Sequence, residues 1–326
     1  MSPPPPEPSH APSVSVIIPA RDAADSIGST LSSVLNQDYP AVGDIVVAAA
    51  DEPTARAAES SGDVRVRVVA NPDGTTPSAL NRALAAGSGE IVVRCDAHAR
   101  LPSGYVSRAV ATLVATGAAN VGGRQVPVGL TPFERAVGMA MVSPIGAGDA
   151  RYRLGGRPGP VDTVYLGVFK RSAVEKVGLF DESLERNQDY ELNWRLRQAG
   201  GVVWFDPALA VEYRPRGSVA DLASQYFQYG RWKREVIRRH QGSWRWRQLA
   251  APALVAGLAL SAFAAVAGSR LAYVVPAAYL ATTIGASIWD LIRTGQAVAV
   301  MEPVALWTMH LAWGWGFIVG PPDRRP

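Results

Sequence analysis

Residues 92–102 read VVRCDAHARLP, and the stretch changes character in its middle. Val92 and Val93 are typical of a buried strand, whereas Asp96 and His98 follow two residues apart. A strand that ends in a carboxylate and an imidazole can direct both groups toward one ligand at the edge of a sheet. This stretch therefore predicts a polar site at the point where the strand ends.

Strand and helix patterns alternate along the N-terminal part of the chain. Strand patterns occur at 13–20, 44–50, 64–71 and 90–96, and helix patterns occur at 26–37 and 77–87. This order predicts an α/β fold with a mostly parallel sheet and helices on both of its faces. Ligands bind beyond the carboxyl ends of the strands in such sheets, which is where Asp96 and His98 fall.

The chain lacks the two glycine-rich phosphate motifs that are common in α/β folds. No G-x-G-x-x-G follows the first strand, and no G-x-x-x-x-G-K-[ST] occurs. The first strand ends instead in Pro19, Ala20, Arg21 and Asp22, of which the last two can contact a polar ligand.

The Asp96–His98 pair suits a divalent cation. Oxygen ligands favour Mg²⁺ or Mn²⁺, and an imidazole shifts the preference toward Mn²⁺. Taken alone, the same pair is also typical of a solvated acid and a surface histidine. A second stretch, RNQDYELNWRLRQAGG at 186–201, predicts a helix with Asp189 in its first turn. An acid at that place is often only a helix cap, so the local pattern leaves the role of Asp189 open.

Long apolar runs begin near Leu249. The runs 249–268 and 271–289 contain no charged residue, and 303–320 contains His310 as its one ionisable residue. Each is close to the ~20 residues that cross a bilayer, so we expect about three transmembrane helices in 249–326. Buried core helices are the alternative, and the third run also suits a position in the membrane interface.

Basic residues precede these runs, with Glu235 as the one acid among Arg and Lys side chains over 231–248. Dense positive charge beside a span marks the cytoplasmic side, so we expect a multi-pass protein of the inner or plasma membrane with its N-terminal domain in the cytoplasm. Tryptophans alternate with these arginines, as in some nucleic-acid sites, but anionic lipid explains a basic segment beside a span. We expect membrane lipid as a partner and no nucleic acid.

Composition sets further bounds. At 326 residues, 48% of them hydrophobic, the chain is long enough for one large domain and a smaller one. Cys95 is the single cysteine, which excludes an internal disulfide and suits a reducing compartment. Residues 1–12 are rich in proline and have no signal-peptide pattern, so we expect a disordered lead-in there.

Three long segments resemble the inverting glycosyltransferases of family 2, which have the GT-A fold. They are residues 14–40, 79–102 and 162–200, and the resemblance runs over about 13–215. More narrowly, RCDAHARLP (94–102), SPIGAGDARYR (143–153) and RNQDYELNWRLRQAG (186–200) resemble the succinoglycan-type, membrane-attached members. Those members extend lipid-linked sugars during exopolysaccharide assembly.

The resemblance implies a role for each matching residue. Asp189 falls at the position of the catalytic base, and Asp96-Ala97-His98 corresponds to the Asp-x-Asp metal motif. The residues implied for donor binding are Pro19, Ala20, Arg21, Asp22, Asp51, Arg94 and Asp96. The family usually has an acid directly after the second strand for the nucleotide, and this chain has alanines there with Asp51 slightly later. A UDP-sugar is the donor that the resemblance favours.

A shorter motif lies before the apolar runs. QYGRW (228–232) resembles the Gln-x-x-Arg-Trp motif of membrane polysaccharide synthases, which borders the acceptor and the donor diphosphate. Gln228, Arg231 and Trp232 are therefore candidates for that site, with Arg231 on phosphate oxygens and Trp232 against a sugar ring. An amphipathic interfacial helix with an ordinary Arg and Trp is the alternative.

The sequence thus predicts a GT-A domain over 13–225, a basic interfacial region over 226–248 and a membrane domain over 249–326. The expected activity is metal-dependent transfer of a sugar, with inversion, from a nucleotide sugar to a lipid-linked acceptor at the cytoplasmic face of the membrane. The product would belong to an exopolysaccharide or a cell-envelope glycan. Two alternatives are a metal-dependent phosphohydrolase of lipid diphosphates and a non-catalytic, membrane-anchored sugar-nucleotide binding protein.

Overall fold

The computed structural model describes residues 11–321, so most of the proline-rich lead-in predicted at 1–12 lies outside the described residues. The chain divides into two compact units. Unit 1 comprises Met1–Arg124 and Arg157–Val211, and unit 2 comprises Gln125–Gly156 and Glu212–Pro326.

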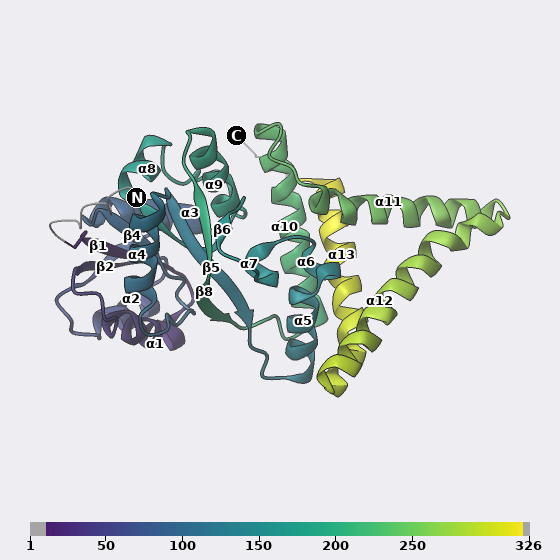
Figure 1. Ribbon diagram of the computed structural model, residues 1–326, viewed down its shortest axis with the longest axis horizontal. Helices are drawn as coiled ribbons and strands as arrows, with labels where there is room; N and C mark the ends of the chain where they lie inside the picture. Colours follow the sequence, from purple (N-terminus) through teal and green to yellow (C-terminus); the bar gives the residue numbers. More distant parts are fainter. Residues whose placement is uncertain (1–10, 322–326) are drawn as a thin grey trace, which may run out of the picture. The chain divides into compact units, whose positions relative to one another are not determined.

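Unit 1 contains the sheet (Figure 1). The strands of the sheet are β1 (Val14–Ala20), β2 (Val42–Ala49), β3 (Val66–Ala70), β4 (Ile91–Arg94), β5 (Asn120–Pro127), β6 (Gly159–Pro160), β7 (Tyr165–Lys170) and β8 (Val203–Tyr213). Strands β5 and β8 extend a few residues beyond the ends of the two segments of unit 1. Its helices are α1 (Ala24–Leu35), α2 (Glu52–Glu59), α3 (Thr76–Ala86), α4 (Tyr105–Thr116), α8 (Arg171–Lys176) and α9 (Gln188–Gln198).

The strand order is β3-β2-β1-β4-β7-β5-β8-β6. The first four strands in this order are parallel, whereas β7 is antiparallel to both β4 and β5, and β6 is antiparallel to β8. Strand β1 lies between β2 and β4, with Ile17 paired to both Val46 and Arg94. The carboxyl ends of β1 and β4 therefore meet at one edge of the sheet.

Alternating apolar residues of β1 bury both faces of the sheet. Val16 and Ile18 pack in a core with α1, α2 and α4, whereas Ile17 packs in a second core with α3, α8 and α9. All three side chains are fully buried, and each such burial is worth about 1.5–3 kcal/mol. β1 is therefore a central strand whose apolar side chains pack against helices on both faces of the sheet (Figure 1).

The predicted α/β fold with a mostly parallel N-terminal sheet and helices on both faces is confirmed. Helix α2 has no counterpart among the predicted elements, because its eight residues, EPTARAAE, carry only a short apolar face. The antiparallel half of the sheet was also not predicted, since β5, β6, β7 and β8 are separated by loops and helices of unequal length.

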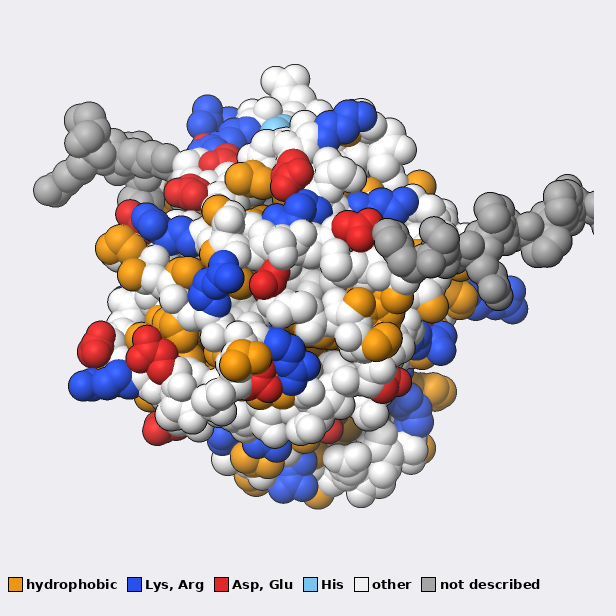
Figure 2. Space-filling view, turned by 90° about the vertical axis from the view of Figure 1, so that its left-hand side faces the viewer, with side chains coloured by type: hydrophobic (Ala, Val, Ile, Leu, Met, Phe, Trp, Pro, Cys, Tyr) orange, Lys and Arg blue, Asp and Glu red, His pale blue; other side chains and the backbone are white. Residues whose placement is uncertain are grey.

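Figure 2 shows the side of the molecule at the left of Figure 1. Basic and acidic side chains are interspersed on it, and hydrophobic side chains form only small groups. This mixture of charges is typical of a surface in contact with water.

Unit 2 is helical. Its helices are α5 (Pro132–Val142), α6 (Pro144–Ala147), α7 (Arg151–Leu154), α10 (Val219–Arg239), α11 (Trp246–Val266), α12 (Val274–Thr294) and α13 (Glu302–Val319), with 3₁₀ turns η1 (Arg270–Tyr273) and η2 (Ala297–Met301). Its core joins α5, α10 and α13 through apolar side chains that include Met141, Leu222 and Leu306.

Helices α10 and α13 approach each other to backbone contact at two glycines. A Cβ atom at Gly230 would lie 2.0 Å from the carbonyl oxygen of Trp313, and one at Gly316 would lie 2.1 Å from that of Phe227. Both distances are far below van der Waals contact, so no larger residue fits there without separating the helices. Gly230 belongs to the QYGRW motif, which is therefore part of a close helix–helix interface.

Two helices within residues 11–321 are long and apolar enough to cross a membrane, Trp246–Val266 and Arg270–Thr294. They coincide with the first two predicted runs, and they keep large apolar side chains such as Phe263, Leu271 and Trp289 exposed. The third run, 303–320, forms α13, whose Leu306 and Met309 are fully buried in the core of unit 2. That α13 crosses a membrane stays a prediction.

Candidate functional site

The candidate site of unit 1 begins where β4 ends. Arg94 is the last residue of β4, and the amide of Cys95 continues the ladder by donating to the carbonyl of Ile17 at 3.0 Å. The Cys95 thiol is fully buried, and burial raises its pKa, so it stays protonated behind the site. Asp96 and His98 follow in the loop at the carboxyl edge, as the sequence predicted.

Arg94 binds two carboxylates at once. Its Nε and Nη2 atoms each lie 2.9 Å from Oδ1 of Asp96, and its Nη1 donates to Oδ1 of Asp189. The Arg94 side chain is only 8% exposed, whereas those of Asp96 and Asp189 are 35% and 40% exposed. One buried cation therefore holds two acids that remain open to a ligand.

The charge of Arg94 is secured by these partners. Burial lowers the pKa of its guanidinium, but the carboxylates of Asp189 and Asp96 outweigh burial and raise that pKa above its ordinary value. A buried charge without partners costs several kcal/mol, so the two acids are needed for this arginine to lie inside the unit.

Asp189 is the second residue of α9, and its carboxylate turns toward Arg94 rather than capping its own helix. Partial burial raises the pKa of Asp189, the Arg94 charge opposes that shift, and Asp96 adds to it. A raised pKa makes the carboxylate a stronger proton acceptor. The structure thus places a partly exposed, basic carboxylate next to the Asp-x-His loop.

His98 is exposed, and its ring is oriented by α1. Its Nδ1 lies 2.7 Å from Oγ of Ser26, and the same Oγ lies 2.9 Å from the carbonyl oxygen of Ala97. When the hydroxyl donates to that carbonyl, Nδ1 must donate to Oγ, which leaves a lone pair on Nε2. A histidine that binds a metal through Nε2 requires this tautomer, with the proton on Nδ1.

The donor atoms present fit a divalent cation. Within residues 11–321, Oδ2 of Asp96 and Nε2 of His98 have no hydrogen-bond partner, and no group of three or more His, Cys, Asp or Glu residues is placed to hold a metal. One carboxylate oxygen and one imidazole nitrogen would therefore supply two ligands. Hard cations that bind with few protein ligands take the others from phosphate and water.

The loop after β1 is tied to the loop after β2 through Asp51. Its Oδ1 accepts from the amide of Thr54 at 2.9 Å and caps α2, while its Oδ2 accepts from the amide of Asp22 at 2.7 Å. The side-chain hydrogen bond with Thr54 contributes most to lowering the pKa of Asp51, and the amide of Asp22 lowers that pKa further. Asp51 therefore stabilises both loops at the carboxyl edge.

The other predicted donor residues lie around this tie. Arg21 and Asp22 are exposed and form an ion pair at 3.5 Å, and Asp22 has a left-handed backbone with φ 50°. Pro19 is half-buried and Ala20 is buried, so Ala20 offers a ligand its backbone rather than its side chain.

Gln228, Arg231 and Trp232 lie on α10 of unit 2. Nε of Arg231 donates to the carbonyl of Gly320 at 2.7 Å, and its guanidinium lies 5.3 Å from the centre of the Phe227 ring. Trp232 is 5% exposed and Gln228 is half-buried. Arg231 thus binds the end of α13, and the ligand roles suggested for the three residues stay predictions.

Residues 15–178 match the family model described as "Glycosyl transferase family 2". The chain is also 33% identical over 258 residues to "Succinoglycan biosynthesis protein ExoA" of Rhizobium meliloti (strain 1021), a match that covers 78% of this chain and 77% of that protein. The chain belongs to glycosyl transferase family 2.

The chain is also 26% identical to the "Pre-mycofactocin glycosyltransferase" of Mycobacterium tuberculosis. That match covers 80% of this chain and 53% of the relative, so the chain spans about half of that protein. Among solved structures, the mannosyltransferase PcManGT from Pyrobaculum calidifontis in complex with GDP-Man and Mn²⁺ has a TM-score of 0.64 at 23% identity. That match covers 96% of this chain and 88% of the other. S. aureus TarS 1-349 in complex with UDP-GlcNAc has a TM-score of 0.51 at 15% identity, covering 67% of this chain and 65% of the other. These likenesses show the GT-A fold.

Two parts of the glycosyltransferase site were missed by sequence reasoning. The sequence assigned Arg94 to the donor, which stays a prediction, but it did not reveal the hydrogen bonds of Arg94 to Asp96 and Asp189. An arginine that ends an apolar strand two residues before an acid is a signal for such an internal ion pair. Ser26 carries no local signal, because its relation to His98 depends on how α1 packs.

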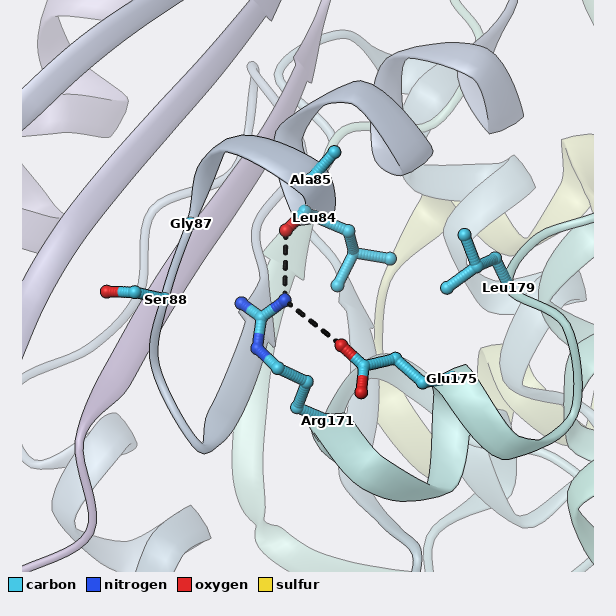
Figure 3. A pocket seen from close by; sticks show the side chains of 7 residues that line it. All are labelled: Leu84, Ala85, Gly87, Ser88, Arg171, Glu175 and Leu179. Carbon is cyan, nitrogen blue, oxygen red and sulfur yellow. Dashed lines mark hydrogen bonds and ion pairs between the residues drawn. The ribbon is translucent and has the colours of Figure 1, made fainter.

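A hollow on another part of unit 1 has a structural explanation (Figure 3). It lies beside the C-terminal end of α3, and Arg171 of α8 points between Leu84 and Glu175. Arg171 donates to the carbonyls of Leu84 at 2.9 Å and Gly89 at 2.6 Å. It thereby satisfies carbonyl groups at the end of α3, before β4 begins, on the amino side of the sheet.

The two roles of Asp51 can be separated by substitution. Asp51→Ser keeps an N-cap oxygen for Thr54, so we expect the melting temperature to stay within a few degrees of the wild type, whereas Asp51→Ala loses about 1 kcal/mol. If the carboxylate also contacts the donor nucleotide, Asp51→Ser weakens nucleotide binding as much as Asp51→Ala does. Thermal unfolding and equilibrium binding of UDP measure the two effects. Unchanged UDP affinity in both variants would restrict Asp51 to capping.

Proposed function

We propose that this glycosyltransferase moves a sugar from a nucleotide sugar, with inversion, to a lipid-linked saccharide or lipid acceptor at the cytoplasmic face of the membrane. The donor we propose is a UDP-sugar, and the product is part of an exopolysaccharide or a cell-envelope glycan. The proposal rests mainly on one observation. Arg94 donates hydrogen bonds both to Asp96, in the metal motif, and to Asp189, at the position of the base. The similarity to a succinoglycan biosynthesis protein supports the polysaccharide product.

Asp189 is the base in this proposal. It accepts the proton of the acceptor hydroxyl while the hydroxyl oxygen forms a bond to the anomeric carbon. The bond from that carbon to the diphosphate oxygen breaks on the opposite side, and the electron pair leaves with the nucleoside diphosphate. A single displacement of this kind inverts the anomeric configuration.

Arg94 has a positioning role in the same step. The guanidinium keeps Asp189 near the donor site, and the partial burial of Asp189 keeps its pKa raised despite that contact. Placing the base in advance removes much of the entropic cost of the reaction.

Asp96 and His98 would hold the divalent cation, Mn²⁺ or Mg²⁺. When bound, such an ion neutralises charge that develops on the leaving diphosphate. Asp96 is held by Arg94 through Oδ1 and His98 by Ser26 through Nδ1, so both donors are oriented from behind. The similar mannosyltransferase structure contains Mn²⁺ together with GDP-Man, which supports a cation in this role.

The membrane part of the proposal rests on unit 2. Helices α11 and α12 are candidate spans, and the basic residues at 231–248 precede them. Positive charge beside a span marks the cytoplasmic side, which supports a cytoplasmic catalytic domain in an inner or plasma membrane protein. A third span at 303–320 completes the proposed multi-pass arrangement.

Replacement of the base tests the mechanism. Asp189→Asn keeps an oxygen for Arg94 but removes the proton acceptor, so we expect transfer to fall by ~10²–10⁴-fold while nucleotide binding stays near normal. The matched control is Glu185→Gln, which makes the same change of charge at an exposed residue just before α9. Transfer of labelled sugar into the lipid fraction and equilibrium binding of the nucleotide are the two measurements. Near-normal turnover in Asp189→Asn would exclude it as the base.

Chelation and substitution test the cation. We expect the wild type to lose activity in excess chelator, His98→Ala to need more Mn²⁺, and His98→Asp to keep partial activity with a preference shifted toward Mg²⁺. Ser26→Ala leaves both ligands in place but frees the ring, so it should raise the required Mn²⁺ concentration by ~10-fold or more. Activity is measured over a titration of each metal. Full wild-type activity in excess chelator contradicts the metal role of Asp96 and His98.

A further inference from the structure

The motif SPIGAGDARYR (143–153) has no part in the mechanism above, and it forms the short helices α6 and α7 of unit 2. It ends at Arg153, whose Nη1 donates to the hydroxyl of Tyr226 on α10 at 2.9 Å. The guanidinium carbon lies 5.6 Å from the centre of the Tyr152 ring and 5.9 Å from that of Tyr226. Tyr229 packs edge-on against Tyr226 with ring centres 5.7 Å apart.

Arg153 lacks a counter-charge. Among residues 11–321 it forms no ion pair with a carboxylate, although it is half-buried. By contrast, Arg94 has Asp96 and Asp189 as partners, and Arg195 has Glu191. Aromatic rings and phenol groups offset only part of the cost of withdrawing a guanidinium from water.

One edge of the guanidinium is unused. Nε of Arg153 is a buried atom without a hydrogen-bond partner, and no hydrogen bond of Nη2 occurs within the described part of the chain. Nε and Nη2 form the side of the guanidinium whose two parallel N–H groups bind phosphate or carboxylate in bidentate fashion. The bond to Tyr226 holds the opposite side, so the unused edge is fixed in orientation.

We propose that Arg153, with the tyrosines of α7 and α10, forms an anion site for the phosphate or diphosphate group of the acceptor. The assignment to the acceptor rests on the proposed transferase function. One observation favours the acceptor over the donor. Arg153 belongs to unit 2, which contains both candidate membrane spans, where a lipid-borne phosphate is present.

Binding to the full-length protein in detergent tests the site. The probes are farnesyl diphosphate, inorganic pyrophosphate and UDP. Arg153→Met should weaken binding of farnesyl diphosphate by ~10-fold or more, because hydrogen bonds between charged groups are lost. Arg153→Lys should restore part of the loss, and Tyr226→Phe should cause a smaller one. The matched control is Arg135→Met, at an exposed arginine of α5, which should bind like the wild type.

The probes separate the sources of the phosphate. Farnesyl diphosphate binding that depends on Arg153 supports the site, and competition by pyrophosphate then shows that the diphosphate alone is recognised. Lack of competition shows that the lipid portion is also required. Equal binding of farnesyl diphosphate to wild type and Arg153→Met overturns the site, and selective loss of UDP binding overturns its assignment to the acceptor.

Two further measurements keep the test decisive. Farnesyl diphosphate should raise the melting temperature of the wild type, a result that needs no variant and that fails if no such site exists. Retained UDP binding in Arg153→Met shows that the variant is folded. If Asp189→Asn transfers sugar normally while Arg153 still determines diphosphate binding, the proposed mechanism fails and the anion site stands.

Discussion

The ion pairs of Arg94 are the constraint on which the proposed site depends. A guanidinium at the buried end of β4 must have negative partners, and the chain supplies Asp96 from the next loop and Asp189 from the start of α9. Because Arg94 is hardly exposed, the acids cannot leave it without exposing or isolating its charge. The fold therefore brings two carboxylates that are 93 residues apart in the sequence to one arginine at the carboxyl edge of the sheet.

Much of this arrangement could be predicted from local patterns. The apolar runs that form β1 and β4, with helix patterns between strands, gave the parallel part of the sheet and the edge where Asp96 and His98 lie. The antiparallel β7 was beyond such reasoning, because pairing between distant strands depends on the packing of the whole sheet. The cap and base interpretations of Asp189 were equally consistent with its helix. Its side chain contacts Arg94 and makes no cap bond to α9, and its role as the base stays a proposal.

Unit 2 shows that hydropathy alone does not predict which apolar side chains of a helix are buried. The runs 249–268, 271–289 and 303–320 look alike in sequence, yet α11 and α12 keep large apolar side chains exposed whereas α13 buries Leu306 and Met309. Leu306 and Met309 are buried because they pack with α5 and α10 in the core of unit 2. The close approach of α10 and α13 at Gly230 and Gly316 is also not revealed by a single-sequence pattern. The same contact gives Gly230 of the QYGRW motif a packing role beside the ligand role suggested for its neighbours.

A double-mutant cycle between Arg94 and Asp189 tests the central claim most directly. Turnover of acceptor is measured for the wild type, Arg94→Met, Asp189→Asn and the double variant, with nucleotide binding as the check on folding. The assays are run at saturating Mn²⁺, so that the support that Arg94 gives Asp96 does not limit turnover. If Arg94 acts by positioning the base, its removal then costs little once the base is gone, so the double variant should lose about as much activity as Asp189→Asn alone. Losses that multiply, with the double variant slower by the product of the two single effects, would contradict the account.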